Sequence, residues 1–116
     1  MGKAGIKGIA RSARRYDLYL PLTDNSGQPI VDRMFDAVER RLVTRFGGLT
    51  TQQREFPLRG IWQGGTRLYL DQVIVMTVLD FRQQGSGRFI ATLKRDLLQD
   101  FDQLEILITE QSLRVY

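Results

Sequence analysis

The chain contains neither cysteine nor histidine among its 116 residues. The lack of cysteine excludes disulfide bonds and thiol chemistry. The lack of histidine removes the commonest general base and transition-metal ligand, which excludes Ser-His-Asp and Cys-His nucleophiles and the usual zinc sites. Catalysis would then depend on carboxylates, lysine, tyrosine or a hydroxyl group. The composition favours a non-catalytic protein and predicts no cofactor.

Long apolar runs are missing as well. No stretch approaches the ~20 apolar residues that a membrane-spanning helix needs. No continuous apolar segment follows the basic N-terminus in the way that a secretory signal requires. The hydrophobic fraction of 42% and the charged fraction of 26% are ordinary for a folded domain. We therefore expect a cytoplasmic protein.

Acidic residues are absent from the first fifteen positions, which are rich in basic residues and glycine. Glycine costs backbone entropy in any regular element, so we expect residues 1–15 to be a flexible basic leader and residues 16–116 to form a single domain. Such a leader could contact nucleic-acid phosphates through its charge. It could equally be a solvated, frayed terminus. Its five positive charges are Lys3, Lys7, Arg11, Arg14 and Arg15.

The most informative stretch is 66–81, whose middle, Val73 to Leu79, consists only of apolar or β-branched residues. Such residues lose rotamer freedom in a helix and suit a strand. Because the run does not alternate with polar residues, we expect a central strand that is covered on both faces.

The remaining pattern predicts two helices and three more strands. An apolar stripe at helical spacing runs through 29–46, with Pro29 at its start and Gly47 as its C-cap. A similar stripe predicts a helix over 87–101. The other strands are expected at 16–22, within 49–62, where Pro57 and Gly60 interrupt the pattern, and from Leu104 onward.

The resulting order β-α-β-β-α-β predicts an α+β protein with the ferredoxin-like plait. This plait has an antiparallel sheet of strand order 4-1-3-2, with two helices on one face. The central positions of the first and third strands agree with the uniformly apolar character of residues 73–79.

The sheet face without helices needs polar side chains or a partner. Either choice of face leaves apolar or aromatic side chains on the open side, which is unusual for a monomer. We therefore predict a homodimer that forms through this face and binds a protein or a small ligand there. The alternative is that the C-terminal tail or the long second strand covers the face. The expected face residues are Tyr19, Val73, Val75, Leu79 and Leu107.

The alternative function is a nucleic-acid-binding protein or a metal-dependent nuclease that uses the basic leader and Asp17. Asp17 and Asp80 fall at the start and the end of neighbouring antiparallel strands, where two carboxylates could hold Mg²⁺ or Mn²⁺. Ion pairs with nearby arginines are the simpler interpretation, so no metal is assigned. Trp62 could stack a nucleic-acid base beside basic residues, but a lone tryptophan is more often a core or interface anchor.

Three short segments, YDLYLPL, RFGGLT and GIW, resemble small bacterial proteins of unassigned function. This resemblance covers most of the chain after Arg15, implies the plait and supplies no function. The YD pair is also similar to a CRISPR-associated family of plaits in which an aspartate beside the first strand is tied to nuclease activity and dimerisation. In that family the aspartate closes the strand, whereas Asp17 would open it. The activity is therefore not carried over.

Overall fold

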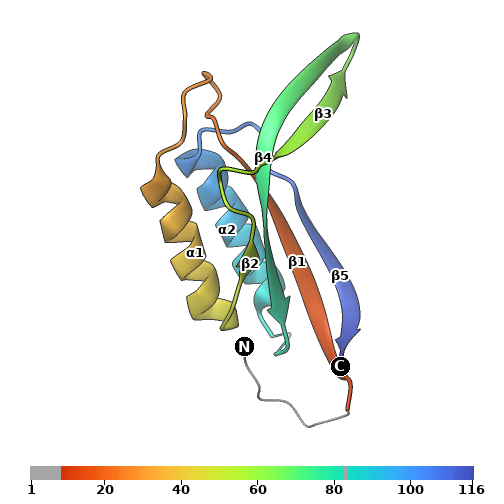
Figure 1. Ribbon diagram of the computed structural model, residues 1–116. Coiled ribbons are helices and arrows are strands. Elements are labelled where there is room, and N and C mark those ends of the chain that lie inside the picture. Colours follow the sequence, from red (N-terminus) through yellow and green to blue (C-terminus); the bar gives the residue numbers. More distant parts are fainter. Residues whose placement is uncertain (1–8, 83) are drawn as a thin grey trace.

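A computed structural model describes residues 9–82 and 84–116. Five strands and two helices follow one another along the chain (Figure 1). They are β1 (Arg11–Pro21), α1 (Asp32–Phe46), β2 (Thr50–Thr51), β3 (Leu58–Gly64), β4 (Arg67–Asp80), α2 (Ser86–Asp100) and β5 (Ile108–Val115). The predicted α+β plait is confirmed. Among the described residues, no helix is long and apolar enough to span a membrane.

The sheet is antiparallel, with β1 between β4 and β5. The predicted order 4-1-3-2 corresponds to the observed path β5-β1-β4-β2. The prediction is incomplete because the second expected strand is in fact two strands, β2 and β3, which both pair with β4. A turn closed by the bond from Phe56 N–H to the Gln53 carbonyl separates them, and Pro57 follows it without an N–H to donate. Between β2 and β3, the Gln52 side chain accepts a hydrogen bond from the backbone N–H of Val75.

β1 begins at Arg11, five residues earlier than expected, because β5 is long enough to pair with this segment from Leu18 down to Arg11. Arg11, Arg14 and Arg15 therefore belong to the sheet and not to a leader. The first helix begins at Asp32, later than the expected Pro29, because Pro29 forms a β-bridge with Thr23. Gly47 is the predicted left-handed C-cap, with φ of 85° and its N–H bonded to the Val43 carbonyl.

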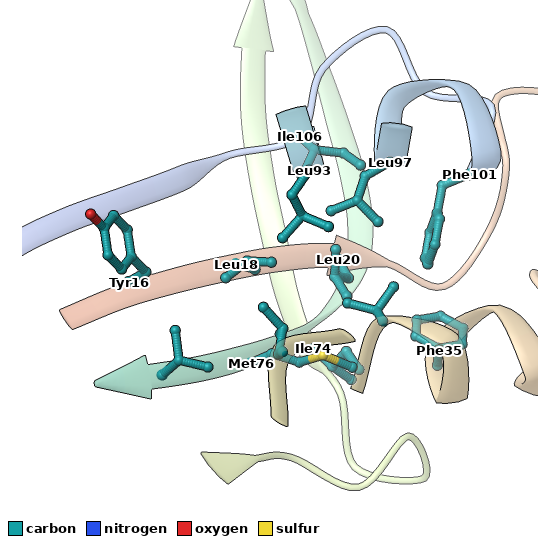
Figure 2. Close-up of a cluster of buried hydrophobic side chains, with 13 residues drawn as sticks. Tyr16, Leu18, Leu20, Phe35, Ile74, Met76, Leu93, Leu97, Phe101 and Ile106 are labelled. Carbon is teal, nitrogen blue, oxygen red and sulfur yellow. The ribbon is translucent and has the colours of Figure 1, made fainter. Parts of the chain in front are cut away.

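The core lies between the two helices and one face of the sheet (Figure 2). Alternate residues of β1 and β4 point to this side because side chains in a strand alternate between the two faces. The helices cover them with residues spaced three or four apart. The buried cluster comprises Tyr16, Leu18 and Leu20 of β1, Ile74, Met76 and Val78 of β4, Phe35, Val38 and Leu42 of α1, Leu93 and Leu97 of α2, and Phe101 and Ile106.

The hairpin of β3 and the first half of β4 extends past the helices as an arm (Figure 1). We call residues 58–72 the hairpin arm. Its two-residue turn is Gly65 and Thr66, one position later than the predicted Gly64-Gly65, because Gly64 still pairs with Arg67. Gly65 has a positive φ of 62°. Except for Gly60, which is partly buried, every residue of the arm is exposed. The arm therefore carries large apolar side chains in solvent, among them Trp62, Tyr69 and Leu70.

Candidate functional site

The open face of the sheet brings together the five residues predicted to form a ligand or dimer face. Tyr19 pairs with Val75, and Leu79 lies on the same side of β4. Val73 shares this parity and is buried, whereas Tyr19, Val75 and Leu79 are partly buried. Leu107 lies next to Tyr19, whose N–H donates to its carbonyl over 3.0 Å. The period-2 alternation of strands places all five residues on the side away from the helices.

A single carboxylate, that of Asp17, lies in the middle of this open face and is only 9% exposed. The Thr77 hydroxyl donates to its Oδ1 over 2.6 Å, and Arg15 Nε donates to the same atom over 3.1 Å. No described residue donates a hydrogen bond to Oδ2. The carboxylate is therefore held in place through one oxygen, and the other can accept a hydrogen bond from a ligand.

The expected carboxylate pair does not form. Asp17 pairs with Thr77, three residues before Asp80 on β4, so Asp80 points to the helix-covered side. There Asp80 is buried, and its Oδ1 accepts the backbone N–H of Arg82 over 3.1 Å. Among the residues that the structure describes, no three acidic side chains gather in a way that could hold a metal ion. The metal-site hypothesis is wrong because the register sends the two carboxylates to opposite faces.

The expected basic site is also dispersed. Arg11 stacks on Phe81 at 4.1 Å, Arg14 pairs with Glu110, and Arg15 pairs with Asp17. Trp62 is in the hairpin arm, at the opposite end of the molecule from Arg11 (Figure 1). Lys3 and Lys7 lie outside the described residues. Among the expected basic neighbours of Trp62, Arg67 lies over the ring of Tyr69, the residue paired with Trp62, at 5.7 Å.

A second polar group lies on the helix-covered side, at the lower end of the sheet in Figure 1. Burial and the charge of Glu110, to which the phenol is hydrogen-bonded, raise the pKa of Tyr16. Arg14 pairs with the same glutamate and partly opposes this rise. Burial and Glu110 together keep the Tyr16 phenol protonated. The Tyr16 ring also packs against Phe46, with 6.1 Å between ring centroids. This arrangement stabilises the end of the core, and Tyr16 itself is only 2% exposed.

Sequence reasoning missed Thr77 as a functional neighbour, because it read the residue as one member of an apolar run. A hydroxyl in a run of otherwise apolar strand residues is the signal that could have identified it. The hydroxyl alone did not indicate its partner. Thr77 and Asp17 are 60 residues apart in the sequence, and their pairing depends on the register of their two strands.

Comparison with known proteins finds similarity of structure only. No protein-family model and no curated protein sequence matches the chain. A phage SAM lyase in complex with S-methyl-5′-thioadenosine has a similar structure, with a TM-score of 0.61 and 13% sequence identity over 99% of this chain and 94% of the lyase chain. A phage SAM lyase in its apo state gives a TM-score of 0.56 and 14% identity, covering 98% and 95% of the two chains.

These similarities correct one expectation. A non-catalytic domain was predicted because histidine and cysteine are absent, and the nuclease alternative relied on a pair of carboxylates. At this identity the comparison shows the fold alone, yet both similar structures are of an enzyme that shares nearly the full length of the chain. The expectation of a non-catalytic domain is therefore corrected, because the same fold is found in an enzyme.

Proposed function

We propose that this protein binds a nucleoside of the S-adenosylmethionine type on the open face of its sheet and acts on it as a lyase. The observation that carries the proposal is the buried Asp17 carboxylate with its available Oδ2, set in an apolar face. The near full-length structural similarity to a lyase that was solved with S-methyl-5′-thioadenosine supports it.

The chemistry of the face suits the parts of such a nucleoside. A ribose presents two hydroxyl donors, and a carboxylate oxygen accepts such hydrogen bonds strongly. Tyr19, on the same face as Asp17, offers an aromatic surface to an adenine ring. Val75, Leu79 and Leu107 supply apolar contacts on either side. Ligand sites are commonly apolar surfaces with a few fixed polar groups, and this face has that composition.

The reaction also suits a site without histidine. S-Methyl-5′-thioadenosine keeps the methyl group and the adenosine of S-adenosylmethionine, so its release breaks the bond from sulfur to the amino-acid chain. The electron pair of that bond remains on sulfur, and the carbon that loses it bonds to an oxygen of the substrate's own carboxylate, closing a lactone. The sulfonium charge and the carboxylate charge are thereby lost together. A surface of low polarity favours a step in which charge disappears, because the charged ground state is solvated less well there than in water. In this proposal Asp17 holds the ribose, and the apolar side chains surround the sulfur.

Binding is tested by isothermal titration calorimetry with S-methyl-5′-thioadenosine. Asp17→Asn keeps an acceptor for Thr77 and removes the charge, and we expect it to weaken binding by about tenfold or more, the usual value of a charged hydrogen bond. Asp100→Asn removes the same charge from an exposed helix end and is the matched control, with unchanged affinity. Absence of binding to the wild-type protein, or equal affinity of both variants, would contradict the proposed site.

Activity is tested separately, by incubating the protein with S-adenosylmethionine and measuring S-methyl-5′-thioadenosine by mass spectrometry. Release above the uncatalysed rate, reduced by Asp17→Asn and by Tyr19→Ala, is the expected result. Binding without release would leave the ligand assignment in place and contradict the lyase assignment.

Two earlier expectations stay as part of this proposal. A second copy of the chain packed on the open face would enclose the ligand and cover the partly exposed Tyr19, Val75 and Leu79. A cytoplasmic location is expected as well.

A further inference from the structure

Four arginines line an open hollow on the helix side of the molecule, where α1 ends and α2 begins. The hollow is formed by Arg40, Arg41, Thr44, Arg45, Arg82 and Phe89. We call it the arginine hollow. Its lining comes from the end of α1, the beginning of α2 and Arg82 after β4, so it lies on the side of the sheet opposite to Asp17. It is therefore separate from the proposed nucleoside site, and nothing in that proposal depends on it.

Positive charge in the arginine hollow greatly exceeds negative charge. Arg41 pairs with Asp96 at 2.9 Å. Within residues 9–82 and 84–116, no carboxylate forms an ion pair with Arg40, Arg45 or Arg82. Like charges held close together repel, which costs stability unless an anion offsets them. The hollow therefore has the charge balance of a site for an anion.

Three of the four arginines, Arg41, Arg45 and Arg82, are held in position by described contacts, and Arg40 is exposed beside them. Arg45 Nη2 donates to the Gln84 carbonyl over 2.6 Å and to Ser86 Oγ over 3.1 Å. Arg82 Nη2 donates to the Arg45 carbonyl over 2.8 Å. The guanidinium groups of Arg41 and Arg45 both lie 5.5 Å from the centroid of the Phe89 ring. Fixed donors lose less entropy when a ligand binds, so this arrangement favours binding.

The beginning of α2 adds to the positive potential. No side chain caps this helix, and its first turn contains no acidic residue. Gly85, in the left-handed conformation, begins the helix beside Arg45. The uncapped N–H groups and the helix dipole favour an anion at this end. Guanidinium groups recognise phosphate oxygens in a bidentate manner.

We infer that the arginine hollow binds a small anion that carries phosphate groups, such as pyrophosphate or the phosphates of a nucleotide. Arg40 and Arg82 contact the ligand directly, since Arg40 has no described ion-pair partner and Arg82 no described carboxylate partner. Arg45 is a positioning residue that orders the segment from Gln84 to Ser86.

The test is isothermal titration of the full chain with inorganic pyrophosphate and, separately, with ATP at constant ionic strength. We expect both to bind the wild-type protein. The double variant Arg40→Ala/Arg82→Ala should weaken pyrophosphate binding by about tenfold or more, since two charge-assisted contacts are lost. Arg33→Ala/Arg95→Ala removes two exposed arginines outside the hollow and is the matched control, with affinity changed by less than about twofold. Tighter binding of ATP would assign the site to a nucleotide.

Because Arg82 also bonds to the end of α1, Arg40→Ala alone serves as a second variant that leaves the described hydrogen bonds intact. It should weaken binding while leaving the circular dichroism spectrum unchanged. Failure of pyrophosphate and ATP to bind at millimolar concentration would overturn the inference. So would an equal loss of affinity in the control pair, or binding of an oligonucleotide with no binding of either small anion.

Discussion

The two halves of β4 both carry large apolar side chains and differ in surroundings. From Val73 to Asp80 the strand pairs with β1, with β3 at Val73 and β2 at Met76 and Thr77 on its other side, and residues facing the helices are buried. From Arg67 to Gln72 it pairs only with β3, and every residue is exposed. Leu70 is 65% exposed, whereas Ile74, four residues later on the same face, is fully buried. Apolar sequence alone therefore does not distinguish a core strand from an arm.

The difference indicates that the arm would have little stability as an isolated hairpin. A two-stranded hairpin has marginal stability in water, and apolar side chains on both of its faces add little while they are exposed. Large exposed apolar areas on a protein usually mark a contact surface. The body of the molecule supplies its own core, whereas the described residues leave the arm uncovered.

The largest expected effect separates the two halves of β4 directly. Ile74→Ala removes fully buried methyl groups and should lower the free energy of unfolding by about 2–5 kcal/mol. Leu70→Ala, on the same face of the arm, should change it by less than about 0.5 kcal/mol. Chemical denaturation followed by circular dichroism measures both. Equal losses would mean that the arm is packed as tightly as the body.

A second test uses adjacent residues on opposite faces. Val75 lies on the open face and Ile74 in the core, so Ile74→Glu should prevent folding while Val75→Glu should leave a folded chain. If the predicted homodimer forms through the open face, Val75→Glu should split it. Light scattering with size-exclusion chromatography should then change from a mass near twice 13.4 kDa to one near 13.4 kDa.

Leu104→Glu, at an exposed position outside the open face and the arm, is the control for that experiment. A wild-type protein that is already monomeric, or a Val75→Glu variant that keeps the wild-type mass, would contradict a dimer at this face.

The smallest expected effect is the pH dependence of the unfolding free energy that Tyr16 contributes. Burial and Glu110 raise the pKa of Tyr16 above its ordinary value of 10.0. A phenol whose pKa is raised on folding contributes stability below its unfolded pKa and loses that contribution as the pH rises through the folded pKa. The unfolding free energy should therefore fall in alkaline solution above about pH 10, and Tyr16→Phe should reduce that fall while costing about 1 kcal/mol at neutral pH.

Denaturation at a series of alkaline pH values measures this contribution, with Tyr116→Phe as the control, because Tyr116 is almost fully exposed. An identical alkaline slope in wild type and Tyr16→Phe would show that another group controls the loss.

Most of the secondary structure could be predicted because it depends on neighbours in the sequence. The stripe through α1 and the left-handed cap at Gly47 follow from local geometry, and the hairpin turn lies one residue later than predicted, at Gly65 and Thr66. The alternation in β1 and β4 also fixed which residues share a face. Boundaries were less accurate where distant segments decide them: β1 extends to Arg11 because β5 pairs with it, and Pro29 joins a bridge to Thr23 instead of beginning the helix.

By itself, the sequence determined the plait, the central place of residues 73–79 and the grouping of Tyr19, Val75 and Leu79 on one face. Only the tertiary structure decided that this face is the open one, that Asp17 meets Thr77 and not Asp80, and that four arginines of distant segments line one hollow. The physical reason is that periodicity is a property of one strand or helix. Register and helix placement depend on contacts between segments far apart in the chain, and a shift of one residue exchanges the two faces of a strand.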